Sequence, residues 1–200
     1  MMNHARYDES ARNFNSLMYD YYAADIKERT GITQGECLDV GSSGGYLGLA
    51  LAKVTDLSFT FLDISTEGLE KAKQHIVEDG LAQRAKTLCA DVQSIPMPDG
   101  SVQLVISRGS IPFWADPAKG LREIYRVLAP GGQACVICGR GSPAVREAIK
   151  EKRGGEEMRK RMGPPRNIPR HDYEQVLKDT GISQISMNRD ESGFWIRMWK

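Results

Sequence analysis

Two features are scarce in this chain: cysteines and long apolar runs. Four cysteines among 200 residues are too few for a disulfide framework. No window is apolar for long enough to cross a bilayer, and the opening residues MMNHARYDES contain no signal-peptide core. These absences exclude the disulfide-rich secreted class and the membrane-spanning class, and we expect a cytoplasmic protein.

The cysteines also lack the arrangement of a zinc or redox site. Cys135 and Cys138 have the C-x-x-C spacing, but they lie in an apolar run that is typical of a strand. On a strand this spacing sends the two side chains to opposite faces. No second cysteine pair or nearby histidine completes a tetrahedral ligand set. We therefore expect the cysteines to be small buried residues, and we expect no metal.

The hydrophobic pattern alternates between short apolar runs and helical periods. Runs typical of buried parallel strands lie at 36–40, 57–64, 85–92, 102–107 and 133–139. Ser65 and Asp116 stand where helix N-caps are expected, and PGG at 130–132 is expected to end a helix. The alternation predicts an α/β fold: a Rossmann-like three-layer sandwich whose seven-stranded sheet is mostly parallel, with an antiparallel C-terminal hairpin.

We expect a single domain over residues 1–200, in four parts. The parts are an N-terminal helical lid at 1–35, a cofactor-binding core at 36–139, a basic insertion at 140–170, and a helix with a hairpin at 171–200. The insertion holds ten Lys or Arg against four Asp or Glu, whereas the whole chain has a net charge of +1. A solvated charged helix is the favoured interpretation, and a mobile cover for an anionic acceptor or a nucleic-acid surface are the alternatives.

A glycine-rich turn, in the stretch LDVGSSGGYLGLA, follows the first predicted strand. It is not a phosphate-binding loop, because no lysine precedes Lys53, and it is not a dinucleotide fingerprint, because Ser43 stands in place of the second glycine. Asp39 lies at the mouth of the turn, where a carboxylate would repel a pyrophosphate but suit an ammonium group. S-adenosylmethionine is such a ligand, since it is cationic and carries no phosphate.

Two further carboxylates end the next two predicted strands. Asp63 can accept hydrogen bonds from both ribose hydroxyls, and Asp91 can accept one from the adenine amino group. Ile64 and Val92 beside them can pack on the adenine faces. Because the carboxyl ends of parallel strands meet at one edge of the sheet, the three aspartates are expected to face one ligand rather than to serve only as caps and turn formers.

Four motifs in order resemble the class I S-adenosylmethionine-dependent methyltransferases, in the small-molecule branch that includes the ubiquinone/menaquinone C-methyltransferases. These motifs are LDVGSSGG, FLDIS, CADVQSIPMPDGSVQLVIS and LREIYRVLAPGG. The resemblance implies S-adenosylmethionine as cofactor and S-adenosylhomocysteine as product. The cofactor-binding residues expected from the motifs and their neighbours are Asp39, Gly41, Ser42, Ser43, Gly45, Asp63, Ile64, Asp91, Val92 and Ser107. Ser43 departs from the family pattern, which has glycine there.

The substrate-side candidates lie near the predicted end of the fourth strand and beyond it. Arg108 is expected either to bind an anionic group of the acceptor or to form a salt bridge with a neighbouring helix. Trp114 is a pocket wall or a core residue beside Phe113. His171 is a candidate general base, and a cap or surface residue is the more ordinary role for it.

The N-terminal segment carries the remaining substrate-side candidate. Tyr19, with Tyr7 and Tyr22, is expected to form a lid over the cofactor or to pack in the core. The sequence thus predicts methyl transfer to a small molecule, with an anionic acceptor as the specific hypothesis. An RNA or protein methyltransferase and a non-catalytic S-adenosylmethionine-binding protein are the alternatives. No catalytic residue is evident, because the donor is already activated and the protein mainly has to align the reactants.

Overall fold

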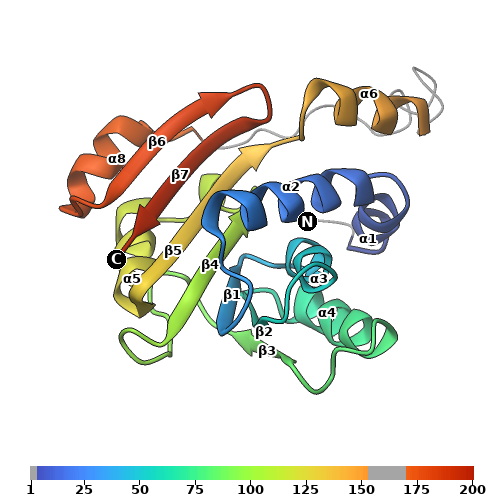
Figure 1. Cartoon of the computed structure of the whole chain (residues 1–200), viewed down its shortest axis with the longest axis horizontal. Helices are drawn as coiled ribbons and strands as arrows, with labels where there is room; N and C mark the ends of the chain where they lie inside the picture. The colour runs from blue at the N-terminus through green and yellow to red at the C-terminus, as the bar shows by residue number, and fades with distance from the viewer. Residues whose placement is uncertain (1–3, 153–169) are drawn as a thin grey trace.

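A seven-stranded sheet runs through the centre of the molecule (Figure 1) in the order β3-β2-β1-β4-β5-β7-β6. The computed structural model describes residues 4–152 and 170–200, with side chains from Asp8 onward. The strands are β1 Glu36–Val40, β2 Ser58–Asp63, β3 Ala85–Cys89, β4 Val102–Arg108, β5 Leu128–Gly139, β6 Ile185–Asp190 and β7 Gly193–Trp199. β7 runs antiparallel to both β5 and β6, and the other pairs are parallel. The predicted fold class is confirmed.

Helices cover both faces of this sheet. They are α1 His4–Asn13, α2 Ser16–Thr30, α3 Tyr46–Ala52, α4 Thr66–Glu78, α5 Pro117–Val127, α6 Pro143–Lys152 and α8 Tyr173–Thr180, with a 3₁₀ turn at Ile111–Phe113. Alternate residues of each strand face opposite sides, so Leu104 and Ile106 join the core under α2 and α3, whereas Val105 joins the core under α5. No helix in the described part of the chain is long and apolar enough to cross a membrane.

The predicted helix starts are confirmed, but the predicted helix end at PGG is wrong. The side chain of Ser65 accepts a hydrogen bond from Gly68 N, and that of Asp116 accepts one from Lys119 N. α5 already ends at Val127, and β5 begins at Leu128. Residues 129–132, which include PGG, form a bulge inside β5. The bulge appears as a register shift in the pairing with β4, between Val102 and Leu104.

The cysteines follow the expectation in part. Cys135 packs into the core under α2 and α3, and Cys138 lies against the core on the other face, as the spacing predicted. Burial raises the pKa of Cys135 to about 12, so this thiol stays protonated at neutral pH. Cys89 is exposed, contrary to the expectation, because β3 is an edge strand.

Tyr22 of α2 joins two distant parts of the chain rather than covering a ligand. It is fully buried, and its hydroxyl donates to Ser192 O at 2.7 Å and accepts from Gly141 N at 2.9 Å. These bonds fasten α2 to the end of β5 and to the turn between β6 and β7. Tyr22 therefore serves the fold. The side chain of Tyr7, also predicted for the lid, lies outside the described residues.

Replacing Tyr22 with phenylalanine is expected to reduce the free energy of unfolding by about 1–3 kcal/mol, because two buried backbone groups lose their partner. The measurement is urea unfolding. Tyr125→Phe is the matched control, since the Tyr125 hydroxyl donates to Gln184 on the surface, and it should change stability by less than about 0.5 kcal/mol. Equal effects of the two substitutions would contradict this role for Tyr22.

Candidate active site

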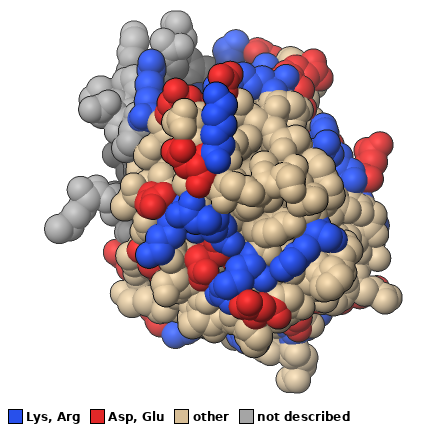
Figure 2. All heavy atoms as spheres, turned by 90° about the vertical axis from the view of Figure 1, so that its left-hand side faces the viewer, with Lys and Arg blue, Asp and Glu red and all other residues tan. Residues whose placement is uncertain are grey.

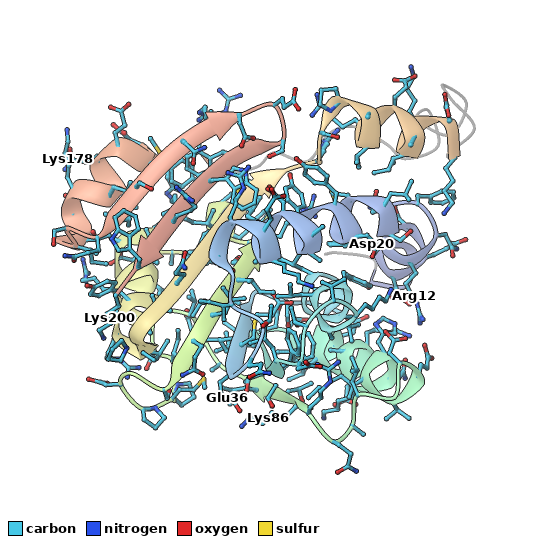
Figure 3. All side chains as sticks on the ribbon, in the orientation of Figure 1. Arg12, Asp20, Glu36, Lys86, Lys178 and Lys200 are labelled. Carbon is cyan, nitrogen blue, oxygen red and sulfur yellow. The ribbon has the colours of Figure 1, made fainter. Side chains whose placement is uncertain are left out.

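The candidate site lies where the strand order reverses, between β1 and β4. The chain adds β2 and β3 on one side of β1 and then returns to place β4 on the other side, which is where open α/β sheets bind ligands. A cleft of about 270 Å³ opens there. Its lining residues are Tyr19, Asp39, Gly41, Ser42, Ser43, Tyr46, Leu47 and Arg108. Glu36 and Lys86, at the amino ends of β1 and β3, mark the opposite edge of the sheet (Figure 3).

Asp39 is a buried carboxylate at the base of this cleft. Its exposed fraction is 2%, and Oδ2 accepts a hydrogen bond from Gly48 N of α3 at 3.0 Å. Burial raises the pKa of Asp39 to about 7, and the nearby Asp63 adds to the rise, whereas the Gly48 N–H opposes it. In the free protein this carboxyl is therefore poised between its neutral and ionised forms at neutral pH.

The glycine turn passes very close to the loop after β4. Gly41 has φ +66°, and a Cβ built on it would lie 2.3 Å from the Cβ of Ser110, so glycine is required there. Both Gly41 N and Ser42 N donate to Leu62 O. The Ser42 hydroxyl is buried and has no hydrogen-bond partner within the described residues, so a ligand in the cleft can satisfy it.

Asp63 fastens the same turn to the end of β2. Its Oδ2 accepts from Ser43 N at 2.7 Å, and its Oδ1 accepts from Ser65 N at 2.8 Å. The carboxylate is half-buried, and each oxygen keeps a further lone pair for a ligand hydroxyl. Ser43, at the position where the family pattern has glycine, adopts φ +49°.

The residues expected around the adenine lie on an open surface beyond the cleft. Ile64 is 72% exposed, so its side chain is available to a ligand. β3 ends at Cys89, so Asp91 lies two residues past the strand rather than at its end, and its carboxylate accepts hydrogen bonds from Gln93 N and Nε2. Val92 is buried in the core beneath α5.

The end of β4 carries a buried hydrogen-bond network. β4 extends one residue further than predicted, to Arg108, and Ser107 is fully buried. The hydroxyls of Ser107 and Ser110 are 2.6 Å apart, and Trp114 Nε1 donates to Ser110 Oγ at 3.2 Å. Trp114 is therefore a core residue under the turn, whereas its neighbour Phe113 is 56% exposed.

Arg108 reaches into the cleft from the end of β4. Its guanidinium lies 5.5 Å from the centre of the buried Tyr19 ring, and Nη2 donates to Gly139 O at 3.0 Å. The salt bridge to a neighbouring helix that we considered is not found among the described residues. Tyr19 and Arg108 thus share one cavity with Asp39 and the glycine turn.

His171 lies apart from this cavity, beside the 3₁₀ turn. Its Nε2 is 3.2 Å from Pro112 O and its ring contacts Tyr173 edge-on. Because a carbonyl oxygen only accepts hydrogen bonds, this contact places the proton on Nε2 and leaves Nδ1 as the basic nitrogen of the neutral ring. The helix cap that follows is Asp172, not His171.

A group around Tyr46 was not predicted. Tyr46 stacks on Tyr19 with ring centres 5.5 Å apart, and its hydroxyl donates to Asp8 of α1 at 2.7 Å. The buried His75 of α4 contacts the same Asp8 carboxylate through Nε2 at 3.2 Å and the Gly44 carbonyl through Nδ1 at 2.8 Å. The position of Tyr46, directly after Gly45, was the one signal for this group in the sequence.

A second hollow, of about 630 Å³, lies between α1, α2, α3 and α4. Tyr19 and Tyr46 line both cavities, so their stacked rings form a wall between the two. Arg12 and Asp20, which also line the hollow, lie at the end of the molecule opposite Lys178 and Lys200 (Figure 3). The described residues include no cluster of three or more His, Cys, Asp or Glu side chains that can hold a metal ion.

Comparison with known proteins agrees with this geometry. Residues 38–136 match the family model of the methyltransferase domain. A structure from Methanococcus maripaludis, assigned as an S-adenosyl-L-methionine-dependent methyltransferase, superposes with a TM-score of 0.84 and 32% identity, over 98% of this chain and 91% of that one. The chain therefore belongs to the class I S-adenosylmethionine-dependent methyltransferases, as the four motifs indicated.

Curated relatives match over the cofactor-binding core. The chain is 39% identical over 101 residues to a 2-methyl-6-phytyl-1,4-hydroquinone methyltransferase of Oryza sativa subsp. japonica. The aligned region covers 50% of this chain and 29% of the relative. It is 33% identical over 105 residues to the ubiquinone/menaquinone biosynthesis C-methyltransferase UbiE of Geotalea daltonii. This aligned region covers 52% of this chain and 45% of the relative. The matched region thus spans less than half the length of either relative.

Ser43→Gly is expected to raise the free energy of unfolding by about 1 kcal/mol, because a left-handed backbone strains every residue with a side chain. Chemical denaturation measures the change. The matched control is Ser94→Gly at an exposed serine without a positive φ. This substitution should lower the free energy of unfolding by up to about 1 kcal/mol, because glycine raises the conformational entropy of the unfolded chain. Destabilisation by both substitutions alike would show that the Ser43 side chain, not its backbone, matters.

Proposed function

We propose that this protein transfers a methyl group from S-adenosylmethionine to a small-molecule acceptor, with the donor bound between the glycine turn and the ends of β1 and β2. One observation carries the proposal: the carboxyl of Asp39 lines a cleft, and burial raises its pKa to about 7, which a positive charge next to it would lower. A ligand with an ammonium group supplies that charge.

The other residues of the site fit the same ligand. Asp39 would hold the ammonium group, the Ser42 hydroxyl would gain its missing partner, and Asp63 would accept from the ribose hydroxyls. The exposed Ile64 would cover one face of the adenine. The Asp91 carboxylate would accept a hydrogen bond from the adenine amino group. When bound, the sulfonium of the donor supplies an activated methyl group, so the protein has to orient the reactants and exclude water.

The acceptor is proposed to lie beyond the end of β4, near the exposed Phe113 and His171. Several relatives are named for hydroquinone or quinone substrates, which supports a hydroxylated aromatic acceptor of that class. His171 holds its Nε2 proton toward Pro112 O, and its Nδ1 would take a proton from such a hydroxyl if the acceptor needs to be ionised. An anionic acceptor stays a further hypothesis.

The face of the molecule over α5 and α8 does not favour the alternative of an RNA methyltransferase. Figure 2 shows the face over α5, α8 and the C-terminal hairpin, where basic and acidic side chains lie next to one another. Arg126, for example, is paired with both Asp99 and Glu123. Such alternation does not make the continuous positive surface that tracks a phosphate backbone. Most of the basic insertion at 140–170, on which a nucleic-acid surface was considered, lies outside the described residues.

The donor site is tested by calorimetric titration with S-adenosylhomocysteine, with NAD as the competing nucleotide. Micromolar binding of S-adenosylhomocysteine, about −8 kcal/mol, and none of NAD is expected. Asp63→Asn should weaken it by about 10- to 100-fold, because charge-assisted hydrogen bonds to the ribose are lost, and the exposed Asp56→Asn should not. Tighter binding of NAD would refute the proposal, and binding without transfer of labelled methyl to any quinol would favour a non-catalytic protein.

Binding is also expected to depend on pH through Asp39. The free protein holds this carboxyl half-protonated near pH 7, whereas the ammonium of the ligand favours the ionised form, so binding must release a proton at lower pH. The affinity for S-adenosylhomocysteine should fall by about 10- to 25-fold from pH 7.5 to pH 5.5. Asp39→Asn should bind weakly at both values. A wild-type affinity that does not change over this range would rule out Asp39 as the ammonium partner.

A further inference from the structure

Arg108 occupies an unexpected place for a residue that recognises the acceptor. It lines the same cleft of about 270 Å³ as Asp39, Gly41, Ser42 and Ser43, which are the residues of the glycine turn and its carboxylate. One small cavity therefore contains a guanidinium and a buried carboxyl. That combination of opposite charges matches a zwitterion rather than a simple cation or anion.

The guanidinium has spare hydrogen-bonding capacity. Nη2 donates to the Gly139 carbonyl at 3.0 Å, while Nε is buried and has no partner among the described residues. No described carboxylate forms an ion pair with it. The face of the Tyr19 ring supports it at 5.5 Å, a contact that favours the cation and restricts its orientation. A half-buried arginine with a free donor next to a cleft is suited to a carboxylate ligand, which it can bind with two parallel hydrogen bonds.

Within the cleft only one part of the proposed donor carries both charges. The methionine moiety has an α-ammonium and an α-carboxylate on the same carbon, whereas the adenosine moiety is neutral. If the ammonium is at Asp39, the carboxylate must lie within a few ångströms of it, inside the same cavity. Arg108 is the cationic residue that lines this cavity.

We propose that Arg108 binds the α-carboxylate of the donor's amino-acid moiety, opposite Asp39, and so belongs to the donor site rather than to the acceptor site. The inference rests on the proposed function, because it takes the ligand of the cleft to be S-adenosylmethionine. It makes Arg108 a residue that selects the intact amino acid, and it leaves recognition of the acceptor to groups beyond the end of β4.

The test compares two ligands that differ in the amino acid. S-adenosylhomocysteine carries the α-carboxylate, and 5′-methylthioadenosine lacks the whole amino-acid part. Arg108→Met is expected to weaken the binding of S-adenosylhomocysteine by about 10- to 100-fold, because a charge-assisted pair is lost. The affinity for 5′-methylthioadenosine should not change. Arg108→Lys, which keeps the charge but not the two-pronged geometry, should lie between wild type and Arg108→Met. Arg122→Met is the matched control, since Arg122 is exposed on α5 and donates to Asp179 O.

A third ligand isolates the carboxylate itself. Decarboxylated S-adenosylhomocysteine keeps the ammonium but lacks the carboxylate, so the wild type should bind it weakly. Because the proposed partner of Arg108 is absent from this ligand, Arg108→Met should bind it with the same affinity as the wild type. Retained binding of 5′-methylthioadenosine shows that the variant is folded. Equal losses for both adenosine ligands, or no loss for either, would overturn the assignment of Arg108. Failure of the wild type to bind any of the ligands would instead overturn the proposed function.

Discussion

The burial of the Asp39 carboxyl is the constraint on which the rest of the site depends. Its hydrogen bond from Gly48 N joins the end of β1 to α3, and α3 must approach closely for this bond to form. A Cβ on Gly48 would lie 2.4 Å from Phe61 Cε1 and 3.0 Å from Asp39 Oδ2, so only glycine permits the contact. A negative charge on the buried Asp39 carboxyl is energetically unfavourable, and a cationic ligand bound next to it would offset this.

Four N–H groups of the turn after Asp39 already donate within the chain, so they are not available to a phosphate. Phosphate-binding turns direct free N–H groups at the ligand. Here the N–H groups of Gly41 and Ser42 donate to Leu62 O, that of Ser43 donates to Asp63, and that of Gly45 donates to Ser42 O. The side chains of Asp39 and Ser42 are what the turn offers to the cleft instead. A cationic ligand with hydroxyl groups suits this arrangement, and a dinucleotide pyrophosphate does not.

What could be read from the sequence depended on how local each signal is. Strands, helix caps and the glycine turn have signals within a few residues, so Ser65, Asp116 and the Asp39 turn were located correctly. Strand order is not local, and this is why Cys89 was expected to be buried although β3 is an edge strand. The contact of Ser110 with Gly41 and the place of Arg108 in the cleft arise from loops that meet only in the folded chain.

The N-terminal helices are tied to the turn through a chain of buried contacts. Asp8 of α1 holds both the Tyr46 hydroxyl and His75, and His75 holds the Gly44 carbonyl of the turn. Both ring nitrogens of His75 face acceptor oxygens, so this side chain is held from two sides. α1 therefore cannot shift without releasing groups that support the glycine turn. Tyr19 and Tyr46 are stacked between the two cavities, so a shift of α1 would also displace their rings. The predicted N-terminal lid therefore contacts the wall of the cleft that contains Asp39.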